Sequence, residues 1–205
     1  MPDLLYRSLV WLDVRLGVLF AVALPLVLLI WSLRRREPAL LRLLSLYWKT
    51  ASLMLIALLL LVDSRPIGYP LLVIAPLLSL LSLWFWVDLN EELADMPPWR
   101  ALPLTVRIWR WSLTLVSLLT SGFALTALPC LGGGVSSSVA CRSWLEAPQA
   151  LNASLDRVFD FIFGADWTPA VAAFVGYVAL VAYAVGLLQW LLVRLPRQGR
   201  VAGGF

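Results

Sequence analysis

Long apolar stretches separated by short polar connections recur along the 205-residue chain. A helix needs about 20 residues to cross roughly 30 Å of hydrocarbon, because each residue adds about 1.5 Å. Five stretches meet or approach this length, and each predicts a membrane-spanning helix: 16–33, 40–62, 69–87, 112–128 and 168–193. Because these runs are continuous, they favour helices over barrel strands of about ten alternating residues.

The second and third stretches are the least regular. Arg42 and Lys49 interrupt the first half of 40–62, so Lys49 has to extend its ammonium group toward the membrane surface. Pro76 lies inside 69–87 and predicts a kink. Two interpretations therefore stay open for residues 40–87: two full crossings or a re-entrant pair.

Composition places the chain in a bilayer. Hydrophobic residues make up 61% of the sequence and charged residues 14%, far from the usual balance of a soluble domain. No polar block is long enough for a separate soluble domain. We therefore predict a single all-α domain, 1–205: a polytopic transmembrane bundle of about five spans, with interfacial amphipathic helices and one extended outer loop at 129–167.

Basic residues are distributed unevenly between the two sides of these spans. Eleven of the 16 lysines and arginines fall on the side that contains Arg34, Arg35 and Arg36. Cytoplasmic connections carry the excess of Lys and Arg, so we expect the N-terminus outside and the C-terminus in the cytoplasm. The net charge of +4 is explained by this topology, and we predict no nucleic-acid partner.

The two cysteines, Cys130 and Cys141, flank the sequence LGGGVSSSVA in the predicted outer loop. Non-cytoplasmic compartments favour disulfides, and a short flexible segment closes at little entropic cost. We predict a disulfide between them; two unpaired thiols are the alternative. Two cysteines supply only half of a usual zinc site, and the chain contains no histidine.

The absence of histidine excludes several kinds of site. It removes Ser-His-Asp catalysis and histidine-ligated haem. LGGGVSSS also lacks the Lys-Ser/Thr ending of a phosphate-binding P-loop and reads as a flexible turn. The sequence therefore predicts no catalytic and no metal-binding residue, and it does not identify a cofactor.

Residues 84–111 read WFWVDLNEELADMPPWRALPLTVRIWRW and stand apart from the apolar runs. If DLNEELAD is helical, its carboxylates lie at i, i+3, i+4 and i+7, on one face. Pro97 and Pro98 then end the helix and turn the chain back. We call residues 88–111 the cytoplasmic hairpin.

The hairpin predicts an electrostatic contact between an acidic helix end and a basic helix start, at the cytoplasmic surface. Its tryptophans are typical of an interfacial aromatic belt. We expect this element to organise the bundle and to recognise a partner. The candidate residues are Asp88, Glu91, Glu92, Asp95, Arg100, Arg107, Arg110, Trp99 and Trp109.

Two other functions have some support. One-face carboxylates beside arginines resemble half of the magnesium-diphosphate site of membrane prenyltransferases, which would make the chain an enzyme acting on a lipid or isoprenoid through 88–95. Those enzymes use two acidic motifs and more spans. A small transporter is the other alternative, although transporters place ionisable groups in mid-span, whereas Lys49 and Asp63 lie near predicted ends.

Two further patterns concern packing. The last span contains small residues that would allow another helix to pack closely against it. We expect this helix to belong to the same bundle, with a helix of another molecule as the alternative. The small residues are Ala172, Gly176, Ala179, Ala182, Ala184 and Gly186. Residues 151–167 and 2–15 have one apolar and one charged face. They predict amphipathic helices that lie on the outer membrane face, with partner docking as the alternative.

The segments MPDLLYRSLVWLDVRLGVLF, YWKTASLMLI and WVDLNEELADMPPWRALPLTVRIWRW resemble an uncharacterised integral-membrane family of cyanobacteria, a domain of unknown function. The resemblance extends over nearly the whole chain and brings no catalytic residues. It implies a plasma or thylakoid membrane, with residues 130–167 in the periplasm or thylakoid lumen. By association, it also implies a role beside a photosynthetic or respiratory complex.

We therefore expect a non-catalytic accessory or assembly component that associates with another membrane protein complex in the lipid bilayer. Bound pigment or lipid stays open, because many aromatic side chains could stack on rings.

Overall fold

The computed structural model describes residues 2–132 and 138–202, which form helices joined by short connections, with no strand among them. This confirms the predicted all-α class. The elements are α1 (Pro2–Gly17), η1 (Val18–Ala23), α2 (Leu24–Arg35), α3 (Pro38–Val62), α4 (Gly68–Trp84), α5 (Val87–Asp95), α6 (Ala101–Ala124), η2 (Leu125–Gly132), α7 (Val139–Phe163), α8 (Pro169–Gln189), η3 (Trp190–Arg194) and α9 (Leu195–Gln198).

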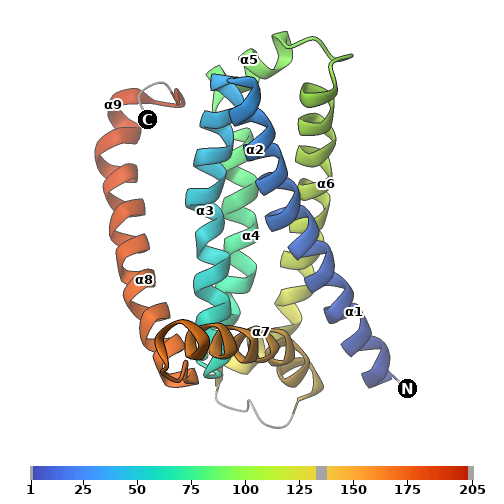
Figure 1. Ribbon diagram of the computed structural model, residues 1–205, viewed down its shortest axis with the longest axis vertical. Coiled ribbons are helices and arrows are strands. Elements are labelled where there is room, and N and C mark those ends of the chain that lie inside the picture. The colour runs from blue at the N-terminus through green and yellow to red at the C-terminus, as the bar shows by residue number, and fades with distance from the viewer. Residues whose placement is uncertain (1, 133–137, 203–205) are drawn as a thin grey trace.

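The long helices run along the long axis of the bundle, and the two termini of the chain lie at opposite ends (Figure 1). Among the described residues, four helical segments are long and apolar enough to span a membrane: Asp3–Arg35, Pro38–Val62, Ala101–Gly132 and Pro169–Arg197. A fifth span results if α4 and α5, which are bent by 60°, count together. The predicted polytopic membrane bundle is therefore confirmed. We call its two ends the α5 end and the α7 end, after the helices that lie there.

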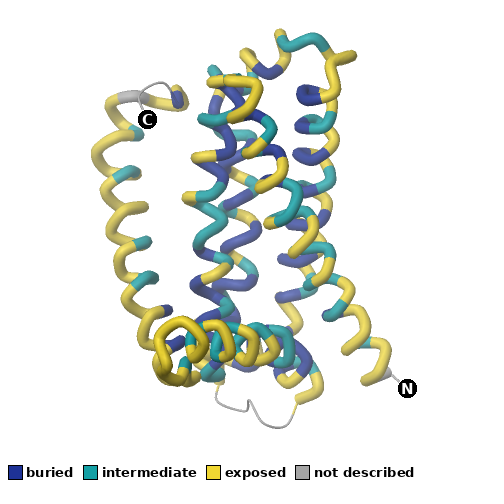
Figure 2. The backbone as a smooth tube through the Cα atoms, in the orientation of Figure 1, coloured by how far each residue is buried: buried dark blue, intermediate teal, exposed yellow. Residues whose placement is uncertain are grey.

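Helices α3 and α4 form the centre of the bundle. They run side by side along its length (Figure 1), and they carry much of its buried surface (Figure 2). Gly68 permits this close approach, because a Cβ atom there would lie 2.6 Å from Leu61 Cγ. Of the two interpretations of 40–87, this arrangement favours two full crossings.

The first long helix also begins earlier than predicted. Residues 2–15 were expected to form a separate helix on the membrane surface, but α1 continues through η1 into α2 (Figure 1). The fourth predicted span, 112–128, is likewise extended, because α6 begins at Ala101. As a result, the polar residues near the N-terminus lie inside the first long helix. Those in the second part of the hairpin lie inside α6.

A π-helical segment, η1, lies in the first long helix, next to Pro25. Proline has no backbone N–H and cannot donate to the carbonyl of Ala21, four residues earlier. The N–H of Leu24 donates to Leu19, five residues earlier, so the carbonyl of Phe20 also lacks its α-helical donor. Both carbonyls need partners from other helices, because the bilayer core offers none.

Two buried aromatic side chains supply these partners. Tyr47 of α3 donates its hydroxyl to the Ala21 carbonyl over 2.6 Å, and Trp109 of α6 donates Nε1–H to the Phe20 carbonyl over 2.8 Å. The two rings meet edge to face, with centroids 5.2 Å apart. These bonds fix the first span against α3 and α6.

Helix α8 lies at the margin of the bundle and is mostly exposed (Figure 2). It packs on α3 near the α7 end through Ala172 and Gly176, where a Cβ atom on Gly176 would lie 3.1 Å from Leu60. This confirms close packing within the bundle for the first half of α8. The small residues Ala182, Ala184 and Gly186 are exposed.

Most of the predicted outer loop is helical. Helix α7 lies across the lower end of the bundle (Figure 1) and contains most of the segment 151–167, which was predicted to be an amphipathic helix. It begins after Ser138, whose Oγ accepts the Cys141 N–H over 3.2 Å, and it ends at Gly164, with φ +63°. Residues 133–137, inside the predicted flexible turn, lie outside the described residues.

The carbonyl pairing at Pro25 predicts the effect of removing one hydroxyl. Tyr47→Phe should lower the free energy of unfolding by about 1 kcal/mol, because the Ala21 carbonyl loses its donor. In a Pro25→Ala background, where residue 25 regains an N–H, the same substitution should cost less. Unfolding of the four proteins in detergent measures this coupling.

Tyr69→Phe is the matched control. Tyr69 is also buried, but its hydroxyl has no hydrogen-bond partner among the described residues, so its removal should leave stability unchanged or slightly higher. Equal costs of Tyr47→Phe in both backgrounds would contradict the pairing.

Candidate functional site

The predicted cytoplasmic hairpin is organised around a break between α4 and α5. Helix α4 ends after Trp84, and Trp86 is extended, with φ −85° and ψ 114°. Val87 N–H, which would donate to the Leu83 carbonyl in a continuous helix, donates to the carbonyl of Arg200 over 3.1 Å. The break thus leaves carbonyls at the end of α4 that need other donors.

Three side chains donate to these carbonyls. Arg110 Nη2 donates to Leu83 O over 2.6 Å, and Asn90 Nδ2 donates to Trp84 O over 3.0 Å. Arg200 Nε donates to Phe85 O over 2.9 Å. The donors come from α6, α5 and the C-terminal segment, so the break joins three parts of the chain.

Arg110 has the most enclosed position among these donors. It is only 6% exposed, its guanidinium lies 4.1 Å from the centre of the Trp84 ring, and Nη2 also donates to Asn90 Oδ1 over 2.5 Å. Arg110 was predicted to face the hairpin carboxylates. It is bound to main-chain and amide oxygens, because the opened end of α4 faces it.

Arg107 behaves in the same way. Its Nη2 lies 3.2–3.4 Å from the carbonyls of Leu93, Ala94 and Met96, at the C-terminal end of α5. Last-turn carbonyls carry the negative end of the helix dipole and lack helical donors. The acidic helix and the basic helix start do meet, as predicted, but the arginine pairs with backbone oxygens.

The four hairpin carboxylates divide into two pairs. Arg42 Nη2, from α3, donates to both carboxylate oxygens of Glu92, over 2.8 Å to Oε1 and 2.6 Å to Oε2. Asp88 accepts the N–H of Ala202 with both oxygens, at 3.0 and 2.9 Å. Glu91 and Asp95 are exposed. One pair therefore holds parts of the fold together, and the other faces outward.

The tryptophans divide similarly. Trp109 was predicted to lie in the interfacial belt, but it is only 1% exposed. It lies inside the bundle, where its indole N–H donates to the Phe20 carbonyl. Trp99, in the turn before α6, is 81% exposed, and Arg100 beside it is also exposed. The outward surface of the hairpin thus contains Glu91, Asp95, Trp99 and Arg100. We call these four residues the hairpin surface.

A cavity of about 400 Å³ adjoins the break, between α3, α4 and the α8–η3 segment. Phe85, Trp86 and Trp190 form part of its largely apolar wall, and Lys49 and Arg194 also line it. Within the described parts of the chain, no three Cys, Asp or Glu side chains are grouped so as to hold a metal ion. The cavity has the size and character of a site for an amphiphilic ligand.

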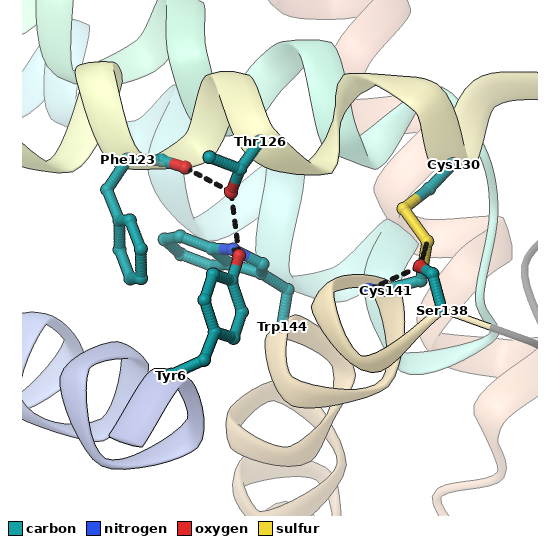
Figure 3. Close-up of a disulfide and its surroundings, with 7 residues drawn as sticks. All are labelled: Tyr6, Phe123, Thr126, Cys130, Ser138, Cys141 and Trp144. Carbon is teal, nitrogen blue, oxygen red and sulfur yellow. Dashed lines mark hydrogen bonds between the residues drawn. A yellow bond between two sulfur atoms is a disulfide. The ribbon is translucent and has the colours of Figure 1, made fainter. Parts of the chain in front are cut away.

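The α7 end carries the predicted disulfide. Cys130 of η2 and Cys141 of α7 are bonded, with their Cα atoms 5.9 Å apart. Beside the disulfide, Trp144 Nε1 donates to the Tyr6 hydroxyl over 3.1 Å, and Tyr6 lies 2.7 Å from Thr126 Oγ1 (Figure 3). This end joins α1, η2 and α7.

A second contact between α1 and α7 involves Glu146. Its Oε2 accepts from Arg7 Nε over 2.7 Å and from Trp11 Nε1 over 2.9 Å. Burial acts to raise the pKa of Glu146, but the hydrogen bonds from Trp11 and Arg7 and the charges of Arg7 and Arg142 outweigh it. The pKa therefore lies below its ordinary value.

The sequence did not indicate the contacts that Asn90, Arg200 and Glu146 make. The break at Phe85 gives no proline or glycine signal, so nothing in the sequence indicates that Asn90 and Arg200 bind its carbonyls. Glu146 is a lone carboxylate in the sequence, and its partners Arg7 and Trp11 lie more than 130 positions away.

The break predicts that Arg110→Met lowers the free energy of unfolding by about 1–3 kcal/mol, because Leu83 O and Asn90 Oδ1 lose a donor in a buried site. Thermal unfolding in detergent measures the loss. Arg100→Met removes the same charge at an exposed position and should change stability by less than about 0.5 kcal/mol. If both variants unfold alike, Arg110 does not hold the break.

The α1–α7 contact predicts a pH-dependent effect. Glu146→Gln should lower stability at pH 7 by less than about 1 kcal/mol, because the ion pair is partly exposed. The folded-state pKa is depressed, so the carboxylate stabilises fully above its ordinary value of about 4.3 and loses this effect as pH falls through the folded-state pKa. The difference between the two proteins should therefore vanish in acid. A stability difference that persists in acid would contradict the role assigned to the Glu146 carboxylate.

Comparison with known proteins shows to which family the chain belongs. No curated protein and no solved structure matches the chain. A family model described as "Protein of unknown function (DUF3177)" matches residues 7–203. This match covers nearly the whole chain, including both ends of the bundle and the hairpin, so the protein belongs to the DUF3177 family.

Proposed function

We propose that the protein is a non-catalytic accessory or assembly component that associates with another membrane protein complex. The division of the hairpin carboxylates carries this proposal. Asp88 and Glu92 stabilise the fold through Ala202 and Arg42, whereas Glu91 and Asp95 face outward.

The hairpin surface has the chemistry of a recognition site. An exposed tryptophan beside exposed charges is typical of the aromatic and charged residues that dominate binding energy at interfaces. Its two carboxylates favour a partner with a basic patch, and Arg100 adds a possible contact to an acidic group. The turn that contains Trp99 lies at the end of the bundle (Figure 1), where another subunit can reach it.

Orientation and location form part of the same proposal. The excess of basic residues supports a cytoplasmic α5 end and an outer N-terminus. A disulfide at the opposite end agrees with an oxidising compartment there. We place the protein in a cyanobacterial thylakoid or plasma membrane, beside a photosynthetic or respiratory complex.

The enzymatic alternative needs the same carboxylates for another purpose. Binding of magnesium-diphosphate by 88–95 would require Asp88 and Glu92 to leave their contacts with Ala202 and Arg42. The contacts of these two residues therefore favour recognition over lipid or isoprenoid chemistry.

The test is affinity purification of the tagged protein from mildly solubilised native membranes, followed by mass spectrometry. We expect stoichiometric subunits of one membrane complex with the wild-type chain. Glu91→Gln combined with Asp95→Asn should reduce their yield at least tenfold without changing thermal unfolding, because neither side chain supports the fold. Subunits of a photosynthetic or respiratory complex would support the finer assignment.

The matched control is Asp160→Asn combined with Asp166→Asn, which removes two exposed carboxylates near the α7 end. This variant should retain the partner. A wild-type protein that purifies alone, or a partner that the hairpin variant retains in full, would overturn the proposal.

A further inference from the structure

We propose that the cavity between α3, α4 and the α8–η3 segment binds a neutral, lipid-soluble molecule whose flat ring carries carbonyl groups at opposite edges, as a quinone does. The ring would lie at Gly186, with a hydrogen bond from Tyr183 on one side and from Gln189 or Trp190 on the other. This inference is independent of the partner proposal, because it concerns a different face of the molecule.

The cavity lies between two places where the C-terminal part of the chain is attached to the bundle. Near the α7 end, Gly176 packs closely on Leu60 of α3. At the α5 end, the C-terminal segment is bonded to α5 and to the break through Ala202 and Arg200. Between these attachments Gly186 lines the cavity, and a Cβ atom there would meet nothing within 4 Å. The cavity therefore offers open space directly beside the backbone of α8.

The polar groups that this cavity leaves without a partner are neutral. The side chains of Tyr183, Gln189 and Trp190 line it and make no hydrogen bond to another described residue. All three belong to the segment Pro169–Arg197, which can span the membrane, and an unpaired polar group there costs free energy. Each of the three side chains can donate a hydrogen bond, and the indole of tryptophan can only donate. The ligand that satisfies them is therefore uncharged and carries acceptors.

The spacing of these donors suits a ligand with two acceptors. Tyr183 lies about one turn before Gly186, and Gln189 and Trp190 lie about one turn after it. The helix rises about 10 Å from Tyr183 to Trp190. A ring that lies at Gly186 thus has donors on two sides, and carbonyl groups at its opposite edges can accept from both.

Aromatic side chains form the wall nearest to the break. Trp190 meets Phe85 and Trp86 edge to face, with centroid distances of 5.9 Å in both cases. Further rings pack well against such aromatic groups, stacked or edge to face. The rest of the apolar wall suits an alkyl or isoprenoid tail, and its leucines are Leu46, Leu78, Leu81 and Leu187.

The two hydroxyl groups that α3 and α4 contribute to the wall are already paired. Thr50 Oγ1 lies 2.9 Å from Ser82 Oγ, and each hydroxyl also donates to a carbonyl of its own helix. They are thus poor candidates for binding a ligand.

The two cations in the lining do not call for an anionic ligand. Lys49 and Arg194 line the cavity, but both side chains already interact with other parts of the protein. The neutral donors of the α8–η3 segment, and not these charges, therefore define the chemistry of the ligand.

Other hydrophobic ligands leave one of these features unused. A carotenoid hydrocarbon has no acceptor for the donors of the α8–η3 segment. A phospholipid has acceptors but no flat ring for the space beside Gly186. The volume of about 400 Å³ lies near the lower end of the usual range of ligand sites, which suits one small ring and the first part of its tail better than a tetrapyrrole.

Isothermal titration calorimetry of the delipidated full-length protein in detergent tests the proposal with two probes. Decylubiquinone has carbonyl groups at opposite edges of its ring, whereas decylbenzene has the same alkyl chain and no oxygen. We expect one site for decylubiquinone and at least tenfold weaker binding of decylbenzene. Phosphatidylglycerol added in excess should not displace decylubiquinone.

Two matched substitutions test the hydrogen bond from α8. Tyr183→Phe keeps the aromatic ring and removes the hydroxyl, so it should weaken decylubiquinone binding about fivefold and leave decylbenzene binding unchanged. Tyr177→Phe removes a hydroxyl from the same helix, at a position that does not line the cavity. This control should bind decylubiquinone as the wild-type chain does.

A third variant fills the space that the ring would occupy. Gly186→Leu places a side chain where the backbone has room, and leucine favours a helix more than glycine does. The variant should therefore fold, as thermal unfolding without a probe can check, and it should lose decylubiquinone binding.

Four outcomes would overturn the proposal. Equal affinity for the two probes would show that the carbonyl groups are not recognised. Equal affinities of Tyr183→Phe and Tyr177→Phe for decylubiquinone would exclude the hydrogen bond, and full binding by folded Gly186→Leu would place the probe elsewhere. Displacement by phosphatidylglycerol would identify an anionic lipid as the occupant instead.

Discussion

The fold depends on one constraint: a backbone carbonyl inside a membrane bundle needs a donor from the protein. Two long helices interrupt their own hydrogen-bond pattern, the first at Pro25 and α4 at the break before α5. Each interruption leaves carbonyls without a donor in their own helix, and an unpaired carbonyl inside the bundle is costly. Side chains of other helices satisfy them, so the irregular points of the helices become the points where helices are joined.

Helix α6 serves both interruptions with adjacent residues. Trp109 donates to the first span at Phe20, and Arg110 donates to α4 at Leu83. Consecutive helical residues point about 100° apart, which lets one turn of α6 reach two neighbours. The position of α6 relative to both helices is therefore fixed at one level of the bundle, and the hairpin that precedes α6 is fixed with it.

The sequence allowed the prediction of features that depend on length and local chemistry. Continuous apolar runs gave the spans, and two cysteines in one connection gave the disulfide. It did not allow the partners of Arg110 and Trp109 to be predicted, because ion pairing and interfacial position are only average preferences of these residues. Pro25 leaves the Ala21 carbonyl without its α-helical donor, but the donor that replaces it, Tyr47, depends on packing between helices distant in the chain.

The carboxylate cluster and the cavity are linked through the C-terminal segment. Asp88 accepts the Ala202 N–H, and the neighbouring Arg200 donates to Phe85, a residue that also lines the cavity. Loss of this attachment would leave the α8–η3 segment held by its packing on α3 and by the contacts of Trp190 with Phe85 and Trp86, and the cavity would lose one of its supports. Asp88 thus helps to hold the C-terminal segment beside the cavity, while Glu91 and Asp95 are exposed at the surface. This separation lets one short acidic helix support the fold through Asp88 and Glu92 and still offer two exposed carboxylates for the contact that we propose with another protein.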